Sequence, residues 1–548
     1  MSTKTHGCVG LMDRRRFMRK AAAFAAGSAL GSSLIGCASF EVEASLPCLG
    51  PAAPPAPVPG MTYIWASKIG CALDCDLLLG LNKYTGGPAT DDGPRINAAM
   101  AGASATNPIT LIIDGSALIS GLFLPAGGYW GIAGLGCGTG FFVKTGTNND
   151  GIHNGSSQVV SNDPGPPVPA VRGMNVTLSN FTLNGNAGTG FDGDSTTGNK
   201  RGNSVAWFFG INLINLNNIA IANLVVVNTP TYHIRFCNVG NVSVSGCVFQ
   251  GVGANSDGIH FDGPDNDITI SNCSFAVQDD SIALNCPEGY YGNISRVTVT
   301  NCTFNSFSMM RLYTTSGTSP YTIDTVKVSN CTGIFTDAVF FIGIFGVSPP
   351  NAVTGLTVSG CNFTAPVLLG VAECFGNIVL TNVTFVPANA NDWIPSETNH
   401  VPAILRPPST FAPVPFTGSS LILQNFVIMR NSDIEVAGLI LEVGMAIDYL
   451  EIDGFSLQDA GPFQPVPVLI DIEEGSIGQL VINSSESQKI AAPVSPGGFS
   501  SVGSVSGVGV LATDWEFPDA VMANEVPYIS ATTGLPSIKI DGVVEPYP

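Results

Sequence analysis

Residues 268–285, ITISNCSFAVQDDSIALN, and residues 297–313, VTVTNCTFNSFSMMRLY, repeat one phrase. In both, a run of alternating β-branched residues is followed by Asn-Cys, a small polar residue and Phe. The same cysteine position recurs along the chain at Cys247, Cys273, Cys302, Cys331 and Cys361. A period of about 20–30 residues made of short strand-like runs and Asn or Gly turns is typical of a solenoid of strands.

Helical periodicity outside the leader is confined to residues 90–103, TDDGPRINAAMAGA. There an Asp that can cap a helix precedes a run of helix formers, which predicts a short helix. Such a helix would cover the apolar cross-section and the strand edges of the first coil. The sequence therefore predicts an all-β fold, a single-stranded right-handed parallel β-helix with a short N-terminal capping helix.

Length and charge limit the organisation and the partners of the chain. Its 548 residues are too many for one ordinary compact core, which fits a repeat array. The net charge of −20 argues against nucleic acid as a partner, because phosphate binding needs a basic surface. We expect four segments: a signal at 1–37, a tether at 38–64, the β-helix at 65–510, and a C-terminal cap or tail at 511–548.

The first 37 residues have the features of an export signal. Residues 13–20, DRRRFMRK, resemble the twin-arginine motif, and LIGC at 34–37 resembles a lipobox in which Cys37 is lipidated. Ordinary cleavage near Ala44 is the alternative, and the apolar run is shorter than the roughly 20 residues of a membrane-spanning helix. The sequence predicts export by the twin-arginine route to the periplasm or cell surface, with membrane contact only through the N-terminal lipid.

The chain has 14 cysteines, which in an exported protein ordinarily suggest disulfides. The regular spacing of the five repeat cysteines indicates instead an interior ladder of buried thiols that behave as small hydrophobic side chains. Cys71 and Cys75 are close enough in sequence for a local disulfide, and the sequence does not decide whether they form one.

The strand-like segments can be aligned by their apolar residues, because side chains in a strand alternate between its two faces. The inward residues are Ile234 and Phe236, Ile259 and Phe261, Ile282 and Leu284, and Leu312. The outward residues are then His233 and Arg235, His260, Ala283, and Arg311 and Tyr313. This alignment brings polar side chains from consecutive coils onto one patch of the wall.

Three aspartates fall on the same patch. Asp257 and Asp280 each lie two residues before an inward isoleucine, so they hold equivalent positions on adjacent coils, with Asp279 one residue earlier. Three crowded carboxyl groups raise the pKa of at least one, and a protonated acid beside ionised carboxylates can perform acid–base chemistry. A lone Asp in such a coil usually caps a turn, and we assign that role to Asp262, Asp265 and Asp267.

The motifs around these residues resemble those of the family 28 glycoside hydrolases, the polygalacturonase group. Residues 255–258, NSDG, look like the family's Asn-Thr-Asp-Gly motif, and residues 278–283, QDDSIA, look like its Gly-Asp-Asp-Cys-Ile-Ala motif. Residues 228–233, NTPTYH, are similar to Asn-Ser-Pro-x-Trp-His, and residues 311–314, RLYT, resemble Arg-Ile-Lys-Thr. The resemblance spans roughly residues 170–335 and places the chain within the pectate-lyase-like β-helix group.

The resemblance implies a polysaccharide hydrolase that inverts the anomeric configuration and uses neither a metal nor an organic cofactor. Asp280 would be the general acid, and Asp257 and Asp279 would activate the attacking water. We assign substrate binding to the polar and aromatic residues of the same patch: His233, Arg235, Asn255, His260, Arg311 and Tyr313.

The chain departs from the family pattern at two points. The interval between the paired aspartates and Arg311 has no histidine, where the family has a Gly-His-Gly motif, so His260 or His233 would have to replace it. Tyr313 stands where the family has a lysine that holds a galacturonate carboxylate, and tyrosine offers instead a stacking surface and a hydrogen bond. A neutral or partly modified polysaccharide is therefore as good a candidate as galacturonate.

Two other functions fit the same residues. A polysaccharide lyase on this scaffold would use the acids to hold calcium and Arg311 as its base. A non-catalytic adhesin or tailspike-like protein would bind glycans through aromatic side chains, and a monomer and a trimer are both open. The aromatic residues considered for glycan binding are Trp207, Phe208, Tyr290, Tyr291 and Tyr313.

Overall fold

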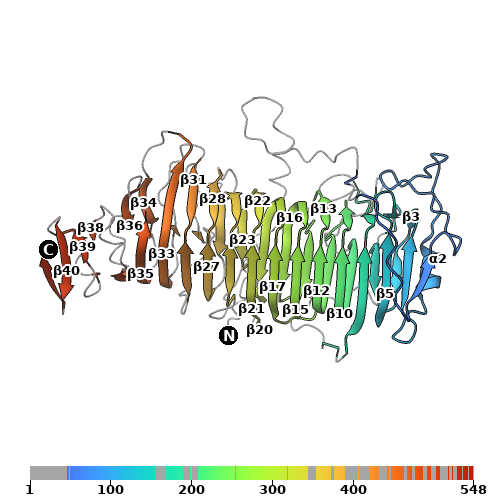
Figure 1. Cartoon of the computed structure of the whole chain (residues 1–548), viewed down its shortest axis with the longest axis horizontal. Coiled ribbons are helices and arrows are strands. Elements are labelled where there is room, and N and C mark those ends of the chain that lie inside the picture. The colour runs from blue at the N-terminus through green and yellow to red at the C-terminus, as the bar shows by residue number, and fades with distance from the viewer. Residues whose placement is uncertain are drawn as a thin grey trace, which may run out of the picture.

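The computed structural model shows an elongated solenoid of strands (Figure 1). It describes residues 46–47 and 50–546, except 148, 155–167, 170, 189–197, 200–207, 254, 317–318, 344–352, 372–374, 389–404, 407–418, 431–440, 443–445, 462–465, 472–475, 486–489, 495–501, 507–515, 518–520, 523–526, 533–534 and 541. The predicted leader, Cys37 and Trp207 lie outside the described residues. None of the described helices is long and apolar enough to cross a membrane.

Parallel pairing between successive coils builds three stacks of strands. The first stack contains β1 (Thr62–Trp65), β2 (Ile109–Ile113), β5 (Gly128–Gly134), β8 (Gly173–Ser179), β10 (Ile211–Ala222), β12 (Ile234–Ser245), β15 (Asp265–Ser271), β17 (Ile294–Thr300), β21 (Ile323–Ser329), β24 (Leu356–Ser359), β27 (Asn377–Thr381), β30 (Ser420–Gln424), β33 (Ala446–Asp459), β35 (Ser476–Ser485) and β37 (Val502–Ser506).

The second stack contains β3 (Ser116–Ile119), β6 (Gly140–Val143), β9 (Thr182–Asn184), β11 (Val225–Val227), β13 (Val248–Gly251), β16 (Ser274–Asn285), β18 (Thr303–Tyr313), β22 (Thr332–Phe335), β25 (Asn362–Ala365), β28 (Thr384–Pro387) and β31 (Val427–Arg430). The third contains β4 (Leu122–Leu124), β7 (Ile152–Asn154), β14 (Ile259–Asp262), β23 (Ala338–Ile342), β26 (Val367–Val371), β29 (Leu405–Arg406), β32 (Leu441–Glu442), β34 (Val466–Asp471) and β36 (Ile490–Val494). The longer strands β10, β12, β16 and β18 bend around a corner and take part in two stacks.

The predicted right-handed parallel β-helix is therefore confirmed, and the corner between its first and second stacks explains the Asn-Cys repeat. The residue before each cysteine position has a left-handed backbone, for example Asn272 with φ 54° and Asn301 with φ 54°, or Gly246 with φ 63°. Asn and Gly adopt this conformation at the lowest cost. The corner between the first and second stacks thus requires the residue type that the sequence repeats.

The repeat cysteines form the predicted interior ladder. All five are buried with free thiols: Cys247, Cys273, Cys302, Cys331 and Cys361. Each donates its S–H to the carbonyl two residues earlier, as Cys273 does to Ser271 at 3.2 Å. Beside them, aromatic rings stack along the core, with Phe249, Phe275 and Phe304 about one strand spacing apart at 4.9 and 5.0 Å. Cys71 and Cys75 also carry free thiols, so no local disulfide joins them.

The capping helix is shorter than predicted. Helix α2 (Gly93–Met100) buries Ile96 and Met100 against the first coils at one end of the solenoid (Figure 1). The Asp92 side chain makes no capping hydrogen bond, but the preceding Asp91 accepts the N–H of Gly93, the first residue of the helix, at 3.1 Å, so the Asp beside the helix start is Asp91. Asp92 has another role. Its carboxylate accepts instead the backbone N–H groups of Ala72 and Leu73, at 2.8 and 2.9 Å. Asp92 therefore ties a preceding loop to the cap.

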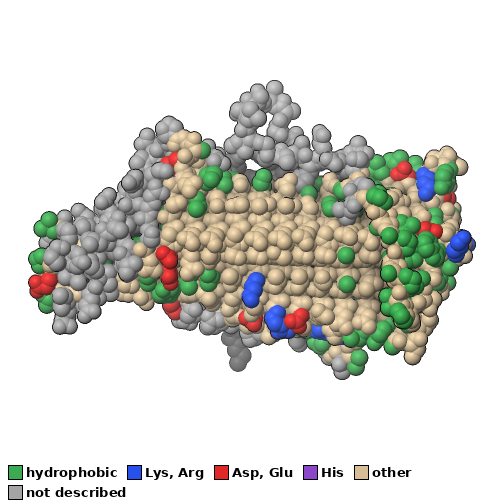
Figure 2. Space-filling model, viewed as in Figure 1, with side chains coloured by type: hydrophobic (Ala, Val, Ile, Leu, Met, Phe, Trp, Pro, Cys, Tyr) green, Lys and Arg blue, Asp and Glu red, His purple; other side chains and the backbone are tan. Residues whose placement is uncertain are grey.

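The opposite end carries a separate four-stranded sheet of β38 (Glu516–Phe517), β39 (Pro527–Ser530), β40 (Pro536–Ile540) and β41 (Val543–Pro546). It meets the last coil where the Val505 N–H donates to the Val521 carbonyl at 2.7 Å. Met522 and Tyr528 are buried in the same core as the solenoid. On the face shown in Figure 2, charged side chains are sparse over the body of the solenoid.

Candidate active site

Asp257 and Asp280 occupy equivalent positions on two adjacent coils of the third stack. The pairing of β14 with β16 places Ile259 opposite Ile282. Just before these residues, the Gly258 N–H donates to the Asp280 carbonyl at 3.0 Å. The alignment predicted from the inward isoleucines is therefore confirmed.

Asp279 completes a cluster of three carboxylates. One oxygen from each of Asp257, Asp279 and Asp280 lies within 4.8 Å of the others, and the residues are 3%, 1% and 1% exposed. Asp279 accepts two backbone N–H groups, that of Asn255 at 3.0 Å and that of Asp280 at 3.1 Å. Asn255, predicted to bind substrate, thus contributes its backbone to the cluster.

Crowding of the acids shifts the titration of Asp257. Burial and then the charge of Asp279 raise the pKa of Asp257 to about 7. Two carboxylates this close cannot both ionise as readily as one, so they titrate as a pair. A proton can therefore be held between Asp257 and Asp279 near neutral pH.

The third acid, Asp280, has a different environment. Arg311 Nε donates to Asp280 Oδ2 at 2.5 Å, and Ser308 Oγ donates to Asp280 Oδ1 at 2.6 Å. The guanidinium also lies over the ring of Phe341, 4.7 Å from its centroid. These contacts stabilise the ionised form of Asp280. A general acid must be protonated, so this environment opposes the acid role that the resemblance gives to Asp280.

The outward column of residues follows the predicted register. Arg235, His260, Ala283 and Arg311 stand opposite one another on successive coils. Arg235 Nε donates to Asp262 Oδ2 at 2.7 Å, in a pair that is almost entirely buried. Both arginines predicted to bind substrate are therefore engaged with aspartates of the protein itself.

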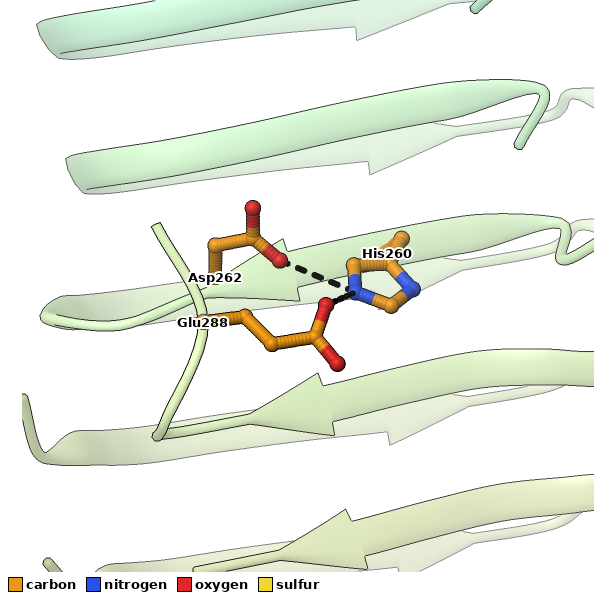
Figure 3. A group of neighbouring side chains, drawn as sticks. All are labelled: His260, Asp262 and Glu288. Carbon is orange, nitrogen blue, oxygen red and sulfur yellow. Dashed lines mark hydrogen bonds and ion pairs between the residues drawn. The ribbon is translucent and has the colours of Figure 1, made fainter. Parts of the chain in front are cut away.

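His260 lies among three acids, two of which, Asp262 and Glu288, are drawn with it in Figure 3. Its Nδ1 is 2.7 Å from Asp257 Oδ2, and its Nε2 is 2.9 Å from Asp262 Oδ1 and 3.1 Å from Glu288 Oε2. The ring of Tyr232 stacks on the imidazole with centroids 3.8 Å apart. Burial alone would lower the pKa of His260, but the hydrogen bond to Asp257 and the nearby carboxylate of Asp262 raise it.

The turn-capping role predicted for three other aspartates holds for one of them. Asp265 accepts the backbone N–H of Val239 at 2.7 Å. Asp262 is instead the partner of Arg235 and His260, and Asp267 forms an exposed ion pair with Arg296. The sequence pattern does not separate these cases, because all three lie within six residues, at the end of β14 and the start of β15.

His233 lies behind the cluster. It is fully buried, its ring meets Phe249 edge-on, and both its Nδ1 and its backbone N lie 2.8 Å from the Asp257 carbonyl oxygen. His233 therefore positions the backbone of Asp257. The alignment predicted that its side chain points outward, and that prediction is wrong. Tyr313 is half-buried and stands opposite Asn285 on the adjacent strand.

Sequence reasoning missed Asp337 and Glu288. Asp337 is buried immediately before β23, and burial raises its pKa, while Arg311 lowers it and Asp280 raises it further. Its amide donates to the Phe307 carbonyl at 3.0 Å, which places Asp337 at the same corner as Asp279 two coils earlier. An Asp just before an apolar run was the signal in the sequence that could have found Asp337.

Glu288 lies in the loop between β16 and β17, where no strand pattern could place it.

The carboxylate cluster is nearly covered by protein. Beside it, Glu288 contacts His260 with a side chain that is 30% exposed. A cavity of about 380 Å³ lies elsewhere, near the N-terminal end, and Cys75, Lys83 and Ser116 are among its lining residues.

Two groups of described side chains have donors close enough to share one metal ion. One is the cluster of Asp257, Asp279 and Asp280, in which Arg311 already neutralises one charge. The other consists of His260, Asp262 and Glu288. The second group alone combines an imidazole nitrogen with carboxylates, the donor set that zinc and manganese accept.

Fold and site together define a parallel β-helix protein with an aspartate-based site on its wall, and paired carboxylates are what glycosidic hydrolysis uses. Residues 167–372 match the model of the glycosyl hydrolases family 28. The match confirms the resemblance carried by the motifs over this part of the chain.

Individual relatives are more distant. The chain is 28% identical over 179 residues to an endo-polygalacturonase of Sclerotinia sclerotiorum, which covers 31% of this chain and 43% of that relative. The chain thus spans less than half the length of this curated relative.

Solved structures are similar to this chain at low sequence identity. The tailspike protein of E. coli bacteriophage HK620, in complex with a pentasaccharide, superposes with a TM-score of 0.52 and 11% identity, covering 82% of this chain and 75% of that chain. A family 28 exopolygalacturonase of Yersinia enterocolitica gives a TM-score of 0.48 and 11% identity, covering 78% and 79%. The tailspike likeness supports the β-helix fold.

Proposed function

We propose that this protein is a glycoside hydrolase that cleaves a pectin-like polysaccharide through Asp257, Asp279 and Asp280. The observation that carries the proposal is the convergence of one oxygen from each acid within 4.8 Å. Glycosidic hydrolysis needs a proton for the leaving oxygen and a carboxylate that activates water. The family match and the polygalacturonase relative support the polysaccharide class.

The roles of the acids follow from their surroundings. The Asp257–Asp279 pair retains a proton because its two like charges disfavour full ionisation, and it supplies that proton to the leaving oxygen. Asp280 stays ionised beside Arg311 and Ser308 and orients the attacking water. A substrate with a good leaving group needs little protonation and therefore tests these roles. It should restore the activity of the Asp257→Asn or Asp279→Asn variant, and it should not restore that of Asp280→Asn.

Inversion of the anomeric carbon is part of the proposal and rests on the family resemblance. Inverting enzymes usually hold their carboxyl groups about 6.5–9.5 Å apart, and retaining enzymes about 5–5.5 Å. The nearest oxygens here lie within 4.8 Å, so their separation gives inversion no support of its own. Proton NMR of the first anomer released decides between the two outcomes.

The substrate is proposed to be esterified or neutral in the sugar that contacts the cluster. Arg235 and Arg311 are paired with Asp262 and Asp280, so neither is available to a galacturonate carboxylate. Tyr313 offers an aromatic ring in place of a cation. Initial rates on esterified pectin should therefore exceed those on polygalacturonate, and the reverse order would remove this part of the proposal.

Export by the twin-arginine route, with lipidation at Cys37, is proposed on the leader sequence alone. Separation of cell envelope fractions tests it, with Cys37→Ser as the variant. Retention of this variant on the membrane would contradict lipid anchoring, and a wild-type protein that stays in the cytoplasm would contradict export.

A further inference from the structure

A second cluster of polar side chains lies next to the carboxylates and has no part in the proposed hydrolysis. It consists of His260 and Asp262 on β14 and Glu288 in the loop that follows β16 (Figure 3). One donor atom from each lies within 4.8 Å of the other two. The cluster therefore joins a strand of the solenoid to a loop of the next coil.

His260 Nε2 cannot donate a separate hydrogen bond to each of the two carboxylate oxygens beside it. This nitrogen carries at most one hydrogen, yet Asp262 Oδ1 lies 2.9 Å from it and Glu288 Oε2 lies 3.1 Å from it. Asp262 is only 2% exposed, and its Oδ1, directed at the ring nitrogen, has no hydrogen-bond partner among the described residues. A buried carboxylate oxygen without a hydrogen bond is costly unless a cation compensates it.

Asn285 adds a second buried atom without a partner. Its Nδ2 lies 3.3 Å from His260 Nε2 and donates to Glu288 Oε1 at 2.9 Å. Its Oδ1 has no hydrogen-bond partner among the described residues, although the residue is only 4% exposed. A half-turn of the amide, which exchanges oxygen and nitrogen, would direct Oδ1 at the same point.

The surroundings of the imidazole suit a metal ligand. Asp257 Oδ2 lies 2.7 Å from Nδ1 of His260 and can accept its hydrogen, which leaves the lone pair on Nε2. Arg235 binds Oδ2 of Asp262, so Oδ1 remains for another partner. The ring of Tyr232, stacked at 3.8 Å, fixes the plane of the imidazole. Each ligand is thus oriented by a second residue.

We propose that His260 Nε2, Asp262 Oδ1 and Glu288 Oε2 bind one divalent transition-metal ion of the zinc or manganese class. Ligands about 2.1 Å from such an ion lie about 3.0 Å apart at right angles and about 3.4 Å apart at the tetrahedral angle of zinc, and the two measured separations are 2.9 and 3.1 Å. The side chain of Glu288 is 30% exposed, which gives the ion an entry path and room for water. Calcium prefers six to eight oxygen ligands and suits a site with a ring nitrogen less well.

Metal binding can be measured without reference to catalysis. The full-length protein is freed of metal with a chelator, and zinc, manganese and calcium chlorides are titrated separately by isothermal calorimetry, with metal analysis after dialysis. We expect about one equivalent of zinc or manganese, and a higher unfolding temperature when it is bound. Glu288→Gln should weaken binding at least about tenfold, whereas Glu545→Gln, on the exposed strand β41, should leave it unchanged.

Three results would overturn the proposal. The first is no binding of zinc or manganese by the wild type. The second is equal binding by Glu288→Gln and the wild type. The third is binding that survives Glu288→Gln but is lost in Asp279→Asn, which would transfer the ion to the carboxylate cluster. Because the readout is binding, the inference can fail while the hydrolase proposal stands, and the hydrolase proposal can fail while metal still binds.

Discussion

Arg311 and Asp280 form a buried ion pair between adjacent coils, with Nε 2.5 Å from Oδ2. Arg311→Met would leave the charge of Asp280 without its partner in the protein interior. Removing one partner of a buried pair costs about 3–5 kcal/mol, which the midpoint of urea unfolding should reveal. Arg296→Met is the matched control, because its pair with Asp267 is exposed and its loss should not be measurable. Equal effects of the two variants would contradict the account.

The three acids of the cluster should each be needed for turnover. Asp257→Asn, Asp279→Asn and Asp280→Asn should each lower kcat on pectin by about 10²–10⁴-fold, the usual contribution of an acid or base. Circular dichroism would verify that each variant folds. Asp267→Asn, an exposed aspartate outside the cluster, should keep the wild-type rate. Wild-type turnover by any of the three cluster variants would remove that residue from the mechanism.

Stability should depend on pH through Asp150, which is not one of the three acids of the cluster. Its carboxylate accepts the Phe209 N–H and the Asn212 amide, each at 2.9 Å, and burial raises its pKa to about 6. The unfolded value is about 3.9, so the folded state binds the proton more tightly. The stabilisation of the folded protein by protonated Asp150 is complete below about pH 4, and about 3 kcal/mol of it is lost as pH rises through 6.

Asp150→Asn cannot titrate and should remove this dependence. Measured against the variant, the free energy of unfolding of the wild type should be higher at pH 4.5 than at pH 8, by up to about 3 kcal/mol. A difference that is the same at both pH values would show that Asp150 has an ordinary pKa in the folded protein.

The left-handed corner residues can be tested at Asn301, where φ is 54°. Asn301→Ala should destabilise the protein by about 1–2 kcal/mol, because Cβ disfavours this conformation. Asn301→Gly should cost less, since glycine already occupies the equivalent corner at Gly246 and Gly360. Thermal unfolding of the two variants provides the comparison, and a more stable Ala than Gly variant would contradict the role of the corner.

The sequence was sufficient for the fold because one corner geometry recurs in every coil. Asn272 and Asn301 need the same backbone angle, and Cys273 and Cys302 fill the same interior slot, so the repeat is visible in the letters. The register of Asp257 with Asp280 followed from the same repeat.

Partner choice within the site could not be read in this way. Whether Arg311 faces substrate or Asp280, and whether Asp262 caps a turn or binds Arg235, depends on side-chain rotamers across coils. Glu288 comes from an irregular loop that has no period. Strand alternation fixes the face of a residue, and it does not fix the neighbour that the residue contacts.

Incubation of purified protein with pectin, followed by analysis of the new chain ends, tests the central claim most directly. Hydrolysis predicts new reducing ends without an unsaturated sugar, and their loss in Asp279→Asn. An ultraviolet-absorbing unsaturated product would make the protein a lyase, and binding of the polysaccharide without any cleavage would make it a glycan-binding β-helix; either result would contradict the account.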